Sequence, residues 1–316
     1  MQIKNSLTDA FDADVKLRLE DVANKLQPKY RRIAVEDVTQ EQDTKENEIS
    51  EFGLADELGM FAAPTEEDVV QGFQINWGFV KWGKRNEIPE ETWRFNKDKD
   101  VVSNALRVSA GLAKSVWNRV DDLTATIVRG GFAGGGNELA PDGLSVYNDS
   151  HRINPGSATT YDNLTANALS HPNLVAARNL MDKMVDMKGE PMDLNMLDQL
   201  VVTPTDLYDQ AVRAVKSTGL PGTPNNDINP LQPNQSNQGR LDVMSWQRLN
   251  SNFTNGSDTN WFLLIPGMSI KVMWGGQIGP EASSYIDQDT KAFVFDTKGF
   301  AVVKCITPRG IIGNGS

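Results

Sequence analysis

The chain has 316 residues and a formal net charge of −11 at pH 7, with 39% hydrophobic and 23% charged residues. This composition supports a folded core and excludes wholesale disorder, and the length favours about two domains. The negative charge argues against a protein that wraps the phosphates of a nucleic acid. The start lacks the apolar run of a signal peptide, and no stretch is apolar over the length of a membrane span. We therefore expect a soluble protein made in the cytosol.

The first 64 residues divide into a helical arm and an acidic segment. Residues 9–27 carry apolar side chains at helical spacing: Phe11, Val15, Leu19, Val22 and Leu26. They predict an amphipathic helix that packs either on its own domain or on a neighbouring subunit. Residues 35–51 contain one basic residue, Lys45, and seven acidic residues: Glu36, Asp37, Glu41, Asp43, Glu46, Glu48 and Glu51. A charge run of this kind predicts a solvated linker.

Residues 69–96 show the alternation of a β-strand. Phe73, Ile75, Trp77 and Phe79 alternate with polar residues or glycine, which predicts a strand with one apolar face. The segment 81–86 is the predicted turn, and 92–95 is the predicted return strand. A lone hairpin has no core of its own, so we expect its aromatic side chains to pack on something else.

Residues 99–129 give the strongest periodic signal. One face carries apolar residues at steps of three and four: Val101, Ala105, Val108, Leu112, Val116, Val120, Leu123 and Ile127. The opposite face carries Asn104, Arg107, Lys114, Asn118 and Asp121. This pattern predicts a helix of about 30 residues, roughly 45 Å long. The glycines that begin at Gly130 predict its end.

The remainder reads as mixed helix and strand. The expected strands are 143–148, 197–202, 241–246, 261–265, 270–274, 292–296 and 299–305, and the expected helices are 173–187 and 205–217. Residues 219–240 form a long polar loop that four prolines keep irregular. A structureless loop of this length is uncommon inside a compact domain.

The residue types of an active site do not gather anywhere in the sequence. His151, His171 and Cys305 are too few and too dispersed for a metal site of the usual nitrogen and sulfur type. The glycines of 130–136 follow a helix and lack the lysine ending of a phosphate-binding loop. Cys305 lies in an apolar run and is predicted to be a buried side chain. We therefore predict no catalytic residues, no cofactor and no metal, and a protein that is not an enzyme.

Four segments resemble, in order, the major head subunit family of Mu-type tailed phages. They are 143–151, 200–207, 226–231, and the strand pair 241–246 with 261–264. Asp149 and Ser150 depart from the pattern of that family. The family is similar in fold to the Hong Kong 97 phage capsid.

The resemblance implies an α+β fold with four parts. These are an N-terminal arm with the acidic linker (1–64), an extended β-hairpin called the E-loop (65–97), a peripheral domain with a long spine helix (98–165, completed by strands from 270–316) and an axial domain (166–269, with the polar loop 219–240). In this architecture the E-loop lies over a neighbouring subunit. Five side chains are therefore expected intersubunit contacts: Phe73, Trp77, Phe79, Trp82 and Trp93.

The function implied by the resemblance is that of a major capsid protein of a tailed phage or prophage. Its copies would form the hexamers and pentamers of an icosahedral head that encloses double-stranded DNA without sequence-specific binding. Scaffold and portal proteins are the other expected partners, and the virion, assembled in the host cytoplasm, is the expected location. Three alternatives stay open: the shell of an encapsulin-like nanocompartment, a phage tail or adhesion protein, and a mixed α/β hydrolase.

Overall fold

The structure is a computed structural model. It describes residues 28–50, 55, 57–58, 63–91, 99–135, 138–219, 228–232 and 239–315. The predicted arm helix, the predicted return strand at 92–95 and most of the loop 219–240 lie outside these residues. None of the described helices is long and apolar enough to cross a membrane.

The predicted long helix is confirmed as α3 (Lys99–Gly130). Val116, Val120 and Ile127 on its predicted apolar face are buried, and Asn118 on the other face is exposed. The helix ends at the predicted glycines. A Cβ on Gly131 would lie 2.9 Å from the Tyr147 ring, so only glycine lets the chain turn this close to that side chain.

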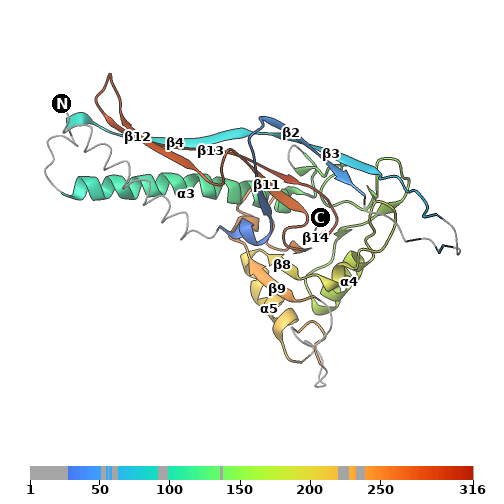
Figure 1. The fold of residues 1–316 in the computed structure, drawn as a ribbon. Coiled ribbons are helices and arrows are strands. Elements are labelled where there is room, and N and C mark those ends of the chain that lie inside the picture. Colours follow the sequence, from blue (N-terminus) through green and yellow to red (C-terminus); the bar gives the residue numbers. More distant parts are fainter. Residues whose placement is uncertain are drawn as a thin grey trace.

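A five-stranded sheet lies along α3 (Figure 1). Its strand order is β1 (Val35–Thr39), β11 (Ile270–Gly275), β13 (Phe293–Cys305) and β12 (Glu281–Ile286). The fifth strand, β4 (Val80–Ile88), also pairs with β13. Residues Phe293–Lys298 of β13 pair with both β12 and β4, so these two strands flank it on opposite edges. Gly299 lets β13 approach the helix closely, because a Cβ there would lie 3.0 Å from Cγ1 of Val116.

A second five-stranded sheet runs β7 (Leu164–Thr165), β14 (Ile311–Asn314), β10 (Trp261–Leu264), β8 (Gln199–Thr203) and β9 (Leu241–Ser245). One set of its side chains, including Val201 and Leu263, belongs to a core that it shares with α4 (His171–Asp182) and α5 (Tyr208–Lys216). The alternate set, including Val202 and Phe262, packs with the C-terminal part of α3 and the first sheet. The period of two therefore places this sheet between two cores.

The shorter elements complete the chain. They are the 3-10 helices η1 (Lys29–Arg32), η3 (Leu194–Met196), η4 (Thr205–Leu207) and η5 (Gln247–Leu249), and the two-stranded pair β5 (His151–Arg152) with β6 (Thr160–Tyr161).

A hairpin is present, but it is not the predicted one, which joined the strand at 73–79 to a return strand at 92–95. Strand β2 (Asp43–Ile49) pairs antiparallel with β3 (Gln71–Gly78), and the two strands enclose a loop over residues 50–70. The predicted turn at 81–86 lies inside β4, which pairs with β13 and not with β3. The alternation of apolar residues identified a strand correctly. It could not identify the strand's partner, which comes from elsewhere in the chain.

The acidic segment 35–51 is not a solvated linker, because it forms β1 and β2. Lys271 Nζ lies 2.9 Å from a carboxylate oxygen of Asp37 and 2.7 Å from one of Glu46. Arg309 lies 2.8 Å from a carboxylate oxygen of Glu48. Both cations lie more than 200 residues from the acidic segment in the sequence. The local composition of 35–51 therefore shows only the excess of negative charge, and the fold brings in the cations that partly neutralise it.

Four smaller expectations also differ from the structure. Residues 143–148 form no strand and contribute only an isolated bridge between Leu139 and Ser145. The two strands expected at 292–296 and 299–305 are the single strand β13. Strand β14 joins the second sheet, not the sheet along α3. The exposed edge strand β12 had no counterpart in the sequence-based interpretation.

Candidate functional site

Trp77 is buried in its own subunit. Its side chain is only 1% exposed and packs in a cluster with Ile75, Met273 and Val302. Lys271 Nζ lies 5.8 Å from the centroid of its ring. The prediction that Trp77 contacts a neighbour is therefore corrected, because β3 lies on the first sheet of the same chain and that sheet already covers the ring.

The other predicted contact residues are half-buried or lie outside the described residues. Trp82 donates a hydrogen bond from Nε1 to the carbonyl oxygen of Ala301 (3.3 Å), and the guanidinium of Arg119 lies 4.3 Å from its ring centroid. Phe79 packs at the edge of the Trp77 cluster. Phe73 lines a small pocket beside Arg309. Contacts of their exposed parts with a neighbour stay a prediction, as does the role of Trp93.

The loop between β2 and β3 (the hairpin loop, residues 50–70) offers an exposed surface, which Trp77 does not. Every described residue from 55 to 69 is exposed. Leu58 and Val69 are 47% and 50% exposed, and their charged neighbours Glu57, Glu66 and Asp68 are acidic. The described part of the loop therefore exposes acidic side chains together with Leu58 and Val69.

A buried arginine anchors the base of this hairpin. Arg309 is 3% exposed and donates to the carbonyl oxygens of Val185 (2.8 Å) and Ile153 (2.6 Å) as well as to Glu48 in β2. Its guanidinium also lies 5.2 Å from the ring centroid of Tyr161. Burial raises the pKa of Glu48, although the charge of Arg309 acts in the opposite direction. The arrangement ties β2 to the start of β14 and to the loops around the second sheet.

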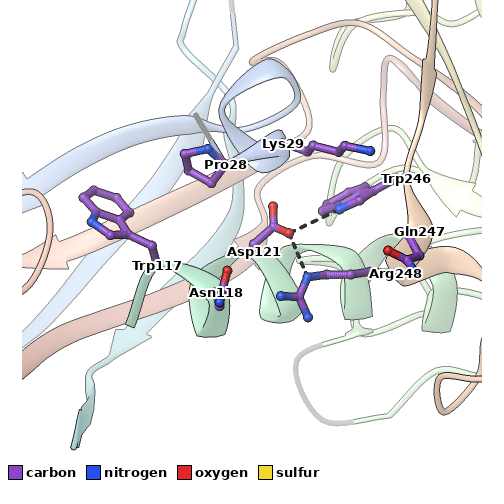
Figure 2. A pocket seen from close by; sticks show the side chains of 8 residues that line it. All are labelled: Pro28, Lys29, Trp117, Asn118, Asp121, Trp246, Gln247 and Arg248. Atoms are coloured by element: carbon purple, nitrogen blue, oxygen red, sulfur yellow. Dashed lines mark hydrogen bonds and ion pairs between the residues drawn. The ribbon is translucent and has the colours of Figure 1, made fainter. Parts of the chain in front are cut away.

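A second junction centres on Asp121 of α3 (Figure 2). One carboxylate oxygen accepts from the backbone N–H of Tyr30 at 3.0 Å. The other accepts from Nε1 of Trp246 at 3.3 Å and from Nε of Arg248 at 2.8 Å. Asp121, Trp246 and Arg248 line an open groove of about 240 Å³, together with Pro28 and Lys29. Asp121 of the long helix thus joins η1 to the segment of Trp246 and η5 that follows β9.

The sequence interpretation placed Asp121 on the solvated face of the helix, and that prediction is wrong. The residue is only 9% exposed. Helical periodicity assigns polar residues to solvent, yet a buried carboxylate is stable when donors satisfy it. Two of its three donors come from residues 125 and 127 positions away, so no local signal could identify them.

We expect replacement of Asp121 with alanine to destabilise the subunit by about 2–4 kcal/mol, because three donors lose their acceptor, one of them a cation. Asp121→Asn keeps one acceptor and should cost less. Chemical denaturation followed by tryptophan fluorescence would measure both changes. Asp206→Ala, at an exposed carboxylate on η4, is the matched control. Equal midpoints for Asp121→Ala and this control would contradict the assignment.

The side chains that could act as a nucleophile or as an acid or base, Cys305, His151 and His171, are held in packing or hydrogen-bonding environments. Cys305 is buried, and burial raises the pKa of its thiol to about 12, so the reactive thiolate is scarce near neutral pH. His151 is fully buried with Nδ1 2.7 Å from Oδ2 of Asp142, and His171 lies 3.0 Å from the side-chain oxygen of Asn229. Among the described residues, no group of three His, Cys, Asp or Glu side chains is placed to hold a metal ion.

Residues 77–314, which are most of the chain, match the phage capsid protein family. The chain belongs to this family. It is a structural subunit of a phage head, and the prediction of a major capsid protein is confirmed. No curated protein sequence matches the chain.

Solved capsids share the fold of this capsid protein. The capsid of cyanophage P-SCSP1u aligns with a TM-score of 0.58 and 8% identity over 91% of this chain and 87% of that chain. The mature capsid of bacteriophage PhiM1 aligns with a TM-score of 0.52 and 12% identity over 92% of this chain and 87% of that chain. A structure from Mycobacterium phage Patience aligns with a TM-score of 0.50 and 10% identity over 98% of this chain and 87% of that chain. The predicted α+β, Hong Kong 97-like capsid fold is therefore confirmed, whereas the Mu-type branch of the family stays a prediction.

Proposed function

We propose that copies of this capsid protein assemble into the hexamers and pentamers of an icosahedral tailed-phage head. The family match over residues 77–314 carries this proposal. In it, α3 and the sheet of β1, β4, β11, β12 and β13 form the peripheral domain. The second sheet with α4 and α5 forms the axial domain, and the β2–β3 hairpin is the E-loop that lies over a neighbouring subunit.

In this proposal the shell encloses double-stranded DNA without reading its sequence, and scaffold and portal proteins take part in assembly. The net charge of −11 suits a coat that contains DNA and does not bind it tightly. The subunit acts structurally and not as a catalyst, which is consistent with the buried surroundings of Cys305 and His151. It is made in the host cytoplasm and ends in the virion.

Negative-stain electron microscopy of the expressed chain, alone and co-expressed with a scaffold protein, tests this function. We expect closed shells, or free rings of five and six subunits. A strictly monomeric protein at high concentration by light scattering, without particles at any salt concentration or with scaffold, would contradict the proposal. Fibres or free trimers in place of shells and rings would contradict it as well.

A further inference from the structure

The β2–β3 hairpin lies across two parts of the subunit, the sheet along α3 and the region around α4. Near Trp77 it packs on that sheet, through Met273 and Val302. Closer to the hairpin loop it lies against Arg309 and against the turn that follows α4. Figure 1 shows the two strands passing above β11 in the view and running towards its right-hand side. Each part of the subunit therefore holds one part of the hairpin.

The turn that follows α4 (residues 185–191, the 185–191 turn) is closed by its own hydrogen bonds. An isolated bridge joins its two ends. The N–H of Asp186 donates to the carbonyl oxygen of Glu190 at 2.9 Å, and a carboxylate oxygen of Asp186 accepts from two further backbone N–H groups. Outside the turn, Nδ2 of Asn154 donates to the carbonyl oxygen of Met187 at 2.7 Å. These bonds fix the turn in one conformation, so it is a stable surface for another element.

The hairpin covers Met187 of this turn. Met187 is only 5% exposed, although turns usually lie open to solvent. A Cβ on Gly72 of β3 would lie 2.7 Å from Sδ of Met187 and 2.8 Å from Cβ of Glu48 on the partner strand. Glycine at this position lets β3 approach both neighbours closely. The backbone of the hairpin therefore lies directly on the Met187 side chain.

Arg309 holds β2 close to the same place. Its guanidinium donates to Glu48 of β2 and to the carbonyl oxygen of Val185, the first residue of the turn, both at 2.8 Å. One side chain thus bonds to the hairpin and to the turn. Because Arg309 is 3% exposed, these bonds are stronger than they would be in water. The ion pair of Glu67 with Lys188 differs, because the Glu67 side chain is 42% exposed, and we expect it to add little.

We propose that Arg309 and the 185–191 turn together fix the direction in which the hairpin leaves the subunit. Glu48, Gly72 and Met187 are then positioning residues. The consequence for assembly rests on the proposed function, because every neighbour then meets the hairpin loop at one defined angle and the shells have one curvature. The contacts lie within one chain, so the hairpin has its direction before subunits meet.

Glu48→Ala/Met187→Ala tests the proposal, because it removes both supports and neither residue belongs to the cores of the two five-stranded sheets. We expect the amide hydrogens of β2 and of residues 71–73 to exchange about tenfold faster, or more, in the unassembled subunit, because this part of the hairpin opens more easily. Exchange in β8 and β10 should stay at the parent rate. Hydrogen exchange followed by mass spectrometry measures all of these segments.

Electron microscopy of the same variant measures the effect on assembly. We expect its shells to have a wider range of diameters than those of the parent, because the hairpin no longer meets each neighbour at one angle. Glu48→Gln keeps an acceptor for Arg309 and should restore the parent exchange rates and diameters. Asn76→Ala, at an exposed position of β3, is the matched control and should resemble the parent.

Gly72→Ala reaches the same contact by adding an atom. The new Cβ would collide with Met187 and Glu48, so β3 must move away from the turn. We expect faster exchange in β2 and in residues 71–73 here too, although no supporting side chain has been removed. Parent exchange rates in this variant would show that the approach of β3 to the turn is not close, and would contradict the proposal.

Three results for Glu48→Ala/Met187→Ala would also overturn the inference. Unchanged exchange in β2 is the first, and shells with the parent range of diameters are the second. The third is an equal acceleration in β8 and β10, because the two residues would then stabilise the whole subunit and not the direction of the hairpin. Absence of particles from the unsubstituted chain would overturn the proposed function, while exchange in the unassembled subunit would still decide whether the hairpin is held in this way.

Discussion

Val120→Asp is expected to prevent the subunit from folding. Val120 is fully buried on α3, in the core that also contains Tyr30, Trp246 and Val272. An uncompensated charge there should cost about 3–5 kcal/mol, against a total stability of about 5–15 kcal/mol for a typical domain. We expect most of the expressed chain to be insoluble and the soluble remainder to lose its near-ultraviolet circular dichroism.

Asn118→Asp is the control for this change. It adds the same charge two residues away, on an exposed position of the same helix, and should change the free energy of unfolding by no more than about 0.5 kcal/mol. Similar solubility and thermal midpoints for the two variants would contradict the assignment of the helix faces.

Replacing residues 51–69 with a short Gly/Ser linker is expected to abolish shell formation while the subunit stays folded. The loop ends are adjacent, because Ser50 N–H donates to the Val70 carbonyl oxygen at 3.0 Å and Val70 N–H donates to Ser50 Oγ at 2.9 Å. The entropy of closing a loop changes slowly with its length, and the described residues of the loop are exposed. The surface removed is the one that we assign to a neighbour.

A Gly/Ser linker as long as the native loop separates the effect of the side chains from that of the length. It should also fold and fail to assemble. Lys188→Ala removes the intrasubunit partner of Glu67 and should leave assembly largely intact. Unfolding of the linker variants would place the loop in the subunit's own core, and normal shells from them would exclude it from assembly.

Local periodicity was sufficient to predict α3, because its two faces differ in polarity over the whole helix and glycines mark its end. It also identified β8, β9, β10 and β11, which are rich in apolar residues. These elements carry their signal in consecutive residues. Their existence could therefore be predicted without knowledge of their partners.

The hairpin and the acidic strands depend on partners that the sequence does not indicate. Strand β4 pairs with β13, more than 200 residues away, and β1 pairs with β11 at a similar separation. The carboxylates of the acidic segment find Lys271 and Arg309 only once these strands are in place. Trp77 was assigned to a neighbour because the residues that cover its ring, Met273 of β11 and Val302 of β13, lie far away in the sequence. A periodic pattern gives the type of an element but not its contacts.

A cryo-electron microscopy reconstruction of the assembled particle tests the central claim most directly, because it shows each subunit beside its neighbours. We predict a shell of five- and six-membered rings in which residues 63–70 of one subunit lie against the next subunit. Trp77 should remain inside its own subunit. A shell in which the hairpin loop contacts no neighbour would contradict the account, and so would a particle that is not built from such rings.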